Sequence, residues 1–174
     1  MIHIHAEVDI DRPVEEVFAY FQDPDNRLQW QTWLVQHEHE PLDIGANVSE
    51  VRNVLGKRVE LRGEIVEFEK DRLIGFRGRG PLVNSVGYQQ RFERLGAART
   101  RVFAEVSFEP NQSLAVARQL IESIVTREVE NSMQHLKDIL EHQDQASHLH
   151  AALPRHHHHA APMVPGGAAD HRSK

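Results

Sequence analysis

The sequence predicts an α+β domain in which a curved antiparallel sheet of seven strands wraps around one long C-terminal helix, with two short helices after the first strand. Three observations support this prediction. Apolar and polar residues alternate over 2–10 and, in short runs, over 33–109, which is the period of half-buried strands. A helical apolar period interrupts the alternation after Ile10. A much longer helical stripe follows Pro110.

The N-terminal segment predicts the first strand and the short helices. Every second residue from Ile2 to Ile10 is apolar, so one face of the strand is apolar. The next apolar residues recur at helical spacing: Val14, Val17, Phe18 and Phe21. Asp11 is the expected cap of this helix, and Pro13 fits its first turn. Asp23-Pro24-Asp25 ends it and starts a further helical segment that runs through Trp30.

Turn residues divide the middle of the chain into strands. The turn segments are Pro41–Gly45, Gly56-Lys57, Lys70-Asp71, Gly80-Pro81 and Gly96–Ala98. Because these connections are short, we expect consecutive strands to pair as an antiparallel meander. Four glycines within the strands permit sharp bends and remove side-chain volume: Gly63, Gly75, Gly78 and Gly87.

After Pro110 the chain predicts one long amphipathic helix, with Asn111 as a plausible cap. Its apolar stripe consists of Leu114, Ala117, Ile121, Ile124, Val125, Val129, Met133, Leu136 and Leu140. Such a stripe needs a large apolar surface, and the sheet is the one available. Beyond the stripe the composition changes, so the chain divides into a domain over 1–141 and a His/Ala/Pro-rich disordered tail over 142–174.

Composition narrows the class of protein. The formal charge of −6 over 174 residues argues against a nucleic-acid partner. No run approaches the ~20 apolar residues of an integral membrane segment, and the N-terminus does not have the pattern of a signal peptide. There are no cysteines and therefore no disulfide framework. A cytoplasmic location is expected.

One segment resembles the opening of the START-like (SRPBCC) superfamily, in its polyketide cyclase/dehydrase branch: Val8-Asp9-Ile10-Asp11-Arg12-Pro13-Val14-Glu15-Glu16-Val17-Phe18, followed by Asp23 and Trp30. Gly45, Leu55-Gly56-Lys57, Val66 and Leu73 also fall as they do in that family. The resemblance covers residues 2–141 and implies the helix-grip fold. Its members range from lipid carriers to aromatase/cyclases and chaperone co-activators.

The architecture predicts a ligand pocket, because a sheet curved around a single helix leaves a hollow between them. We expect an apolar small molecule, such as a lipid or a polyketide, to bind there. The expected lining residues are Trp30, Trp33, His37, Leu61, Ile65, Phe76, Tyr88, Gln90, Phe92, Val102, Ala104, Ile121, Ile124 and Val125. The alternative is that bulky side chains of this set fill the hollow as core.

The orientation of two polar pairs stays open at this point. His37 and His39 lie two apart on a strand and share a face with Val35; facing inward they could transfer protons, and facing outward they would be idle. Glu50 and Arg52 could bind a ligand carboxylate if they face inward, or form an exposed ion pair. Tyr88 and Gln90 are the expected polar anchors of the ligand.

No motif for covalent catalysis is present, since the sequence lacks a Gly-x-Ser-x-Gly turn and cysteine. The alternative to a carrier is an aromatase/cyclase-like enzyme that acts on a polyketide-type substrate by general acid–base catalysis. A protein-interaction or chaperone co-activator module is a further alternative. No cofactor is expected.

Most of the 13 histidines lie in the tail: His142, His148, His150, His156 to His159 and His171. Clustered imidazoles on a flexible chain bind Ni²⁺, Cu²⁺ or Zn²⁺ loosely. A defined metal site is not expected, because it needs fixed ligands with a supporting shell.

Overall fold

One antiparallel sheet of seven strands dominates the computed structural model, which describes the backbone of residues 1–152 and the side chains of residues 1–142. Its strands are β1 (Ile2–Ile10), β2 (Leu34–His39), β3 (Asn47–Val54), β4 (Lys57–Glu69), β5 (Leu73–Arg79), β6 (Val83–Gly96) and β7 (Arg99–Pro110). The order β1-β7-β6-β5-β4-β3-β2 makes strands β2 to β7 the predicted meander, with β1 added beside β7. The predicted fold class is confirmed.

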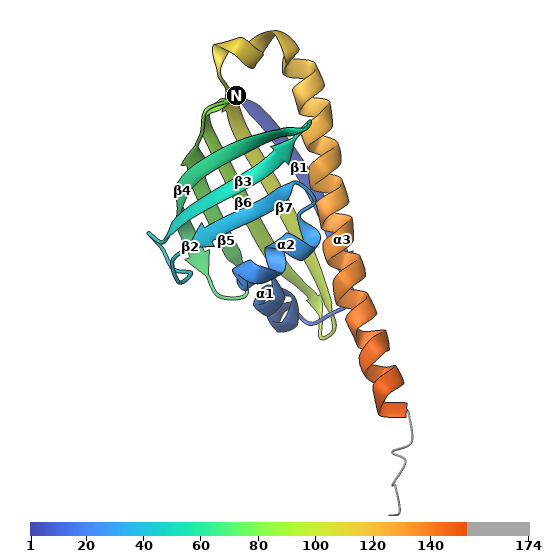
Figure 1. Ribbon diagram of the computed structural model, residues 1–174. Helices are drawn as coiled ribbons and strands as arrows, with labels where there is room; N and C mark the ends of the chain where they lie inside the picture. The colour runs from blue at the N-terminus through green and yellow to red at the C-terminus, as the bar shows by residue number, and fades with distance from the viewer. Residues whose placement is uncertain (153–174) are drawn as a thin grey trace, which may run out of the picture.

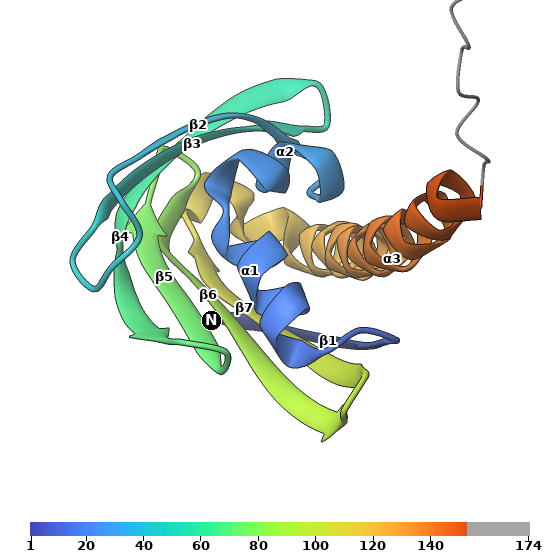
Figure 2. The same cartoon turned by 90° about the horizontal axis from the view of Figure 1, so that it is seen from below.

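The helices lie on the concave side of this sheet (Figures 1 and 2). α1 (Val14–Gln22), the 3₁₀ turn η1 (Pro24–Asn26) and α2 (Arg27–Trp30) follow β1, and the 3₁₀ turn η2 (Gln112–Ala117) leads into α3 (Arg118–Ala152). α1 buries Phe18 and Phe21 against Phe92 of β6, with ring centroids 5.1 and 5.2 Å apart. α1 therefore covers one end of the sheet, and η2 covers the opposite end.

The start of α1 differs from the prediction. Pro13 precedes its first residue, and no side chain caps the helix. Asp11 instead donates its backbone N–H to Glu141 of α3 at 3.0 Å, and Lys137 of α3 donates to the carbonyl of Asp9 at 2.7 Å. The β1–α1 connection is thus fastened to the second half of α3.

The long C-terminal helix extends further than its apolar stripe predicts. α3 runs to Ala152, so the expected start of the tail at residue 142 falls within the helix. Its stripe is fully buried at Val129, Met133, Leu136 and Leu140, whereas Ile121 and Val125 in its first half are only half-buried. Residues 153–174, and with them the predictions of disorder and of metal binding for most of the tail, lie outside the described residues.

β4 and β5 are antiparallel neighbours that approach each other closely where Gly63 pairs with Gly78. A Cβ atom at Gly63 would collide with the backbone of Arg77 and Gly78, so this approach requires glycine. Within the described residues, no helix combines the length and apolar character that crossing a bilayer requires.

Candidate functional site

Two neighbouring pockets lie between the concave face of the sheet and the helices. The inner pocket, of about 90 Å³, lies beside α1 and α2. The outer pocket, of about 310 Å³, lies between the sheet, η2 and the first half of α3. Arg52, Tyr88 and Glu128 border both. Side chains therefore divide the hollow without filling it.

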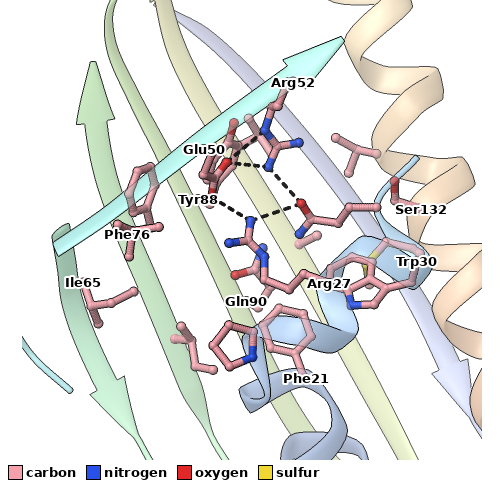
Figure 3. Close-up of a pocket in the computed structure, with 18 of the residues that line it drawn as sticks. Phe21, Arg27, Trp30, Glu50, Arg52, Ile65, Phe76, Tyr88, Gln90 and Ser132 are labelled. Atoms are coloured by element: carbon pink, nitrogen blue, oxygen red, sulfur yellow. Dashed lines mark hydrogen bonds and ion pairs between the residues drawn. The ribbon is translucent and has the colours of Figure 1, made fainter. Parts of the chain in front are cut away.

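Glu50 and Arg52 both face the inner pocket, and the alternative of an exposed ion pair is wrong. Glu50 is 1% exposed and Arg52 is 8% exposed. Arg27 of α2 donates from Nη2 to Oε1 of Glu50 at 2.7 Å, and Arg52 donates from Nε to Oε2 of Glu50 at 3.0 Å. One buried carboxylate thus holds two guanidinium groups, one from α2 and one from β3 (Figure 3).

Gln31, which follows α2, completes this network. Its side-chain oxygen accepts from Nη2 of Arg27 at 3.1 Å and from Nη2 of Arg52 at 2.8 Å. The Arg52 guanidinium also lies 5.0 Å from the centroid of the Tyr88 ring, a favourable cation–π distance. The two arginines are consequently fixed in position by neighbours on β3, on β6 and in the connection after α2.

The network controls the charges in the inner pocket. Burial alone would raise the pKa of Glu50, but Arg27 and Arg52 outweigh it and lower the pKa to about 2. Burial and the neighbouring Glu50 together raise the pKa of Tyr88 to about 12, against the opposing effect of Arg52. At neutral pH Glu50 is therefore an anion, and the Tyr88 hydroxyl keeps its proton.

Glu128 on α3 forms the other side of the boundary. Its Oε1 accepts from Ser132 Oγ at 2.8 Å and from Thr32 Oγ1 at 3.1 Å. One face of α3 carries residues at helical spacing that include this glutamate: Val125, Glu128, Val129 and Ser132. That spacing is the signal by which the sequence could have placed Glu128 in the site.

The histidine pair is divided between two environments. A β-bulge between Leu34 and Gln36 shifts the register, so His37 shares its face with Leu34 and not with Val35 as predicted. His37 lies opposite Glu50, and its buried Nδ1 has no hydrogen-bond partner among the described residues. Burial, then Arg27 and His39, lower the pKa of His37. His37 lies outside both pocket linings, whereas His39 borders the inner one.

The predicted lining residues separate into three groups. The inner pocket takes Trp30, Ile65, Phe76, Tyr88, Gln90 and Ala104. The outer pocket takes Trp33, Leu61, Tyr88, Ile121 and Val125. The structure leaves His37, Phe92, Val102 and Ile124 outside both. Phe92 and Val102 share the concave face but lie at the end of the sheet that α1 covers.

Much of the lining of the outer pocket consists of residues that were not predicted from the sequence. Its unanticipated apolar members include Val54, Val59, Leu82, Val86, Phe108 and Leu114. Alternate turns of a meander lie at the same end of a sheet, and the β3–β4 and β5–β6 turns therefore meet η2. This topological rule could have placed the residues of these turns in the outer pocket.

Several polar groups of the inner pocket have no partner within the described part of the chain. The buried Nε1 of Trp30 makes no hydrogen bond, and neither the Tyr88 hydroxyl nor the Gln90 amide has one there. These groups are uncharged and can bond to an oxygen atom of a ligand. No group of three or more His, Cys, Asp or Glu side chains suited to a metal ion occurs among the described residues.

The sequence of residues 1–141 matches the family described as polyketide cyclase/dehydrase and lipid transport. The chain belongs to this family. The predicted resemblance to the polyketide cyclase/dehydrase branch is thereby confirmed. No curated protein matches the sequence.

Solved structures of this fold include two proteins with 18% sequence identity to this family member. The Zhui aromatase/cyclase from Streptomyces sp. R1128 has a TM-score of 0.73 and covers 83% of this chain and 96% of its own. The protein TTHA0849 from Thermus thermophilus has a TM-score of 0.70 and covers 87% of this chain and 99% of its own. A START superfamily protein from Mycobacterium smegmatis is 12% identical, with a TM-score of 0.70 and coverages of 82% and 99%. At these identities the similarity concerns the fold.

Proposed function

We propose that this family member binds an apolar small molecule whose hydrophobic body occupies the outer pocket and whose polar end reaches the inner pocket. The outer pocket carries this proposal, because its volume of about 310 Å³ is lined mainly by aliphatic side chains of the sheet and α3. Burial of ~300 Å² of ligand contributes about 7 kcal/mol, against an association cost of at least ~4 kcal/mol. Apolar contact alone therefore supports weak to moderate binding.

Val125→Trp is expected to abolish binding, because the larger ring occupies the outer pocket between α3 and the sheet. The measurement is the affinity for 2-naphthol by isothermal titration calorimetry, together with native mass spectrometry for molecules that copurify. Leu120→Trp is the matched control, since Leu120 lies on the same helix and is 60% exposed. Equal affinity of the wild type and Val125→Trp would place the ligand elsewhere, and a wild type that binds no apolar compound would remove the proposal.

A second candidate function is an aromatase/cyclase-like reaction. The observation that favours it is the protonated Tyr88 hydroxyl, which has no partner among the described residues and borders both pockets. A phenol in this position can donate a proton or a hydrogen bond to a substrate carbonyl. The similarity in fold to an aromatase/cyclase agrees with this candidate.

Tyr88→Phe is expected to lower cyclisation about 10²-fold, the smaller end of the contribution of a general acid. The substrate is a poly-β-ketone thioester of N-acetylcysteamine, and the products are quantified by mass spectrometry. The melting temperature should change little, and the affinity for 2-naphthol should fall by no more than the loss of one hydrogen bond, about tenfold. Tyr20→Phe is the control, because the Tyr20 hydroxyl bonds to Gln29 away from the pockets. Absence of turnover by the wild type, or full turnover by Tyr88→Phe, argues against an enzymatic role for this residue.

A further inference from the structure

We propose that Glu50 determines the class of ligand: by pairing with Arg27 and Arg52, it makes the inner pocket select uncharged, oxygen-bearing ligands over carboxylates. The inference rests on the proposed function and assigns its specificity. A pair of buried arginines beside an apolar pocket would otherwise indicate a site for an anion, since guanidinium groups bind carboxylates in a bidentate manner.

The hydrogen bonds show where the arginine donors are used. Each oxygen of Glu50 accepts from a different guanidinium, at 2.7 Å from Arg27 and 3.0 Å from Arg52. Nη2 of Arg52 lies 3.0 Å from Oε2 of Glu50 as well, and the Gln31 oxygen accepts from both arginines. Glu50 therefore occupies the position that a ligand carboxylate would take between the two guanidinium groups.

The charges that border the inner pocket also balance. Arg27 and Arg52 are cations, and Glu50 and Glu128 are carboxylates; Tyr88 and His39 are the other titratable groups that line it. A ligand carboxylate would add a third anion to a site with little room for water. Burial of a charge without a new partner is strongly unfavourable.

Apart from the two arginines paired with Glu50, the hydrogen-bond donors of the pocket that have no partner among the described residues are neutral. Trp30 is 3% exposed, and its indole N–H has no acceptor among the described residues. The Tyr88 hydroxyl and the Gln90 amide line the same pocket. The inner pocket, with a volume of about 90 Å³, thus offers hydrogen bonds to a carbonyl or phenolic oxygen and no free salt-bridge partner.

The wild type provides the first test. Titration calorimetry at pH 7 compares 2-naphthol, which is uncharged, with 2-naphthoate, which has the same ring system and carries a carboxylate. We expect 2-naphthol to bind at least about tenfold more tightly, the equivalent of one charge-assisted hydrogen bond. Equal affinities would overturn the assignment of Glu50 but leave the proposed function intact. No binding of either compound would overturn both.

Glu50→Gln should remove most of the preference for 2-naphthol, because it frees the two guanidinium groups for the ligand. We expect the affinity for 2-naphthoate to rise about tenfold while that for 2-naphthol stays within about threefold. Glu128→Gln is the matched control: it removes the same charge from the opposite side of the same pocket, but leaves both arginines bonded to Glu50. An equal gain in Glu128→Gln would overturn the proposal, since net charge alone would then explain it.

A second variant covers the case in which Glu50→Gln does not fold, which circular dichroism will show. Arg27→Met removes one cation and leaves Glu50 paired with Arg52. The affinity for 2-naphthoate is then expected to fall below that of the wild type by about tenfold, with 2-naphthol little changed. An unchanged affinity for 2-naphthoate would contradict the role of the charge balance.

Discussion

Glu50→Ala is expected to lower the free energy of unfolding by about 3–5 kcal/mol, because it leaves two buried guanidinium groups without their carboxylate. Glu50 is 1% exposed and joins α2 to β3 through Arg27 and Arg52. Urea unfolding followed by circular dichroism at pH 7 measures the loss. Glu60→Ala is the control, because Glu60 and Arg62 form an ion pair with the same spacing along a strand but are 50% and 75% exposed. It should cost less than about 1 kcal/mol.

The pH dependence distinguishes the ion network from simple packing. The pKa of Glu50 is lowered from 4.5 to about 2 in the folded protein. The contribution of the Glu50 charge to the free energy of unfolding is therefore present above pH 4.5 and is lost as the pH falls towards 2. The difference in stability between the wild type and Glu50→Ala should shrink over that interval. A difference that is equal at pH 7 and pH 3 would show that the carboxylate charge contributes nothing.

Phe18→Ala is expected to lower the free energy of unfolding by about 3–5 kcal/mol, through lost burial and the cavity that remains. Phe18 is 1% exposed and meets Phe68 and Phe92 edge to face, with centroids 6.0 and 5.1 Å apart. The same urea titration measures the change. Since α1 covers the end of the sheet away from the outer pocket, the affinity of the folded variant for 2-naphthol should change little.

Phe103→Ala controls for the loss of an aromatic ring as such. Phe103 lies on β7, where its ring contacts Arg91 and His5, and it is only partly buried. We expect a loss of about 1 kcal/mol, in keeping with the smaller area it buries. Equal losses in the two variants would mean that α1 does not hold the sheet through Phe18.

The fold could be predicted from the sequence because the spacing of apolar residues stays regular over the length of its main strands and of its long helix. The alternation in β1 and the stripe of α3 both have a single dominant apolar face, and the turn residues separate the strands. The exceptions are local. Asp11 does not cap α1, and η2 replaces the first turns predicted for the long helix. Both depend on contacts with distant segments, Glu141 for Asp11 and Pro81 for Asn111.

The site was harder to predict, because a strand period assigns residues to a face but does not say which face is buried when it carries charges. In β3 the inward set is Val48, Glu50, Arg52 and Val54, half of it charged. That burial is favourable because Arg27 of α2 and Gln31, which follows α2, bond to the charged pair. No pattern in the sequence marks these two residues as its partners. The bulge in β2 likewise changes the face of His37 in a way that its spacing from Val35 cannot reveal.

The uneven burial of α3 has a consequence for exchange of the ligand with solvent. From Val129 to Leu140 the apolar face of the helix is buried, and Lys137 and Glu141 bond it to the β1–α1 connection. Ile121 and Val125, over the outer pocket, are only half-buried. Local opening costs least where little surface is buried. α3 is therefore anchored in its second half and held less firmly over the outer pocket, so the ligand proposed above would have a route of exchange while the rest of the molecule stays folded.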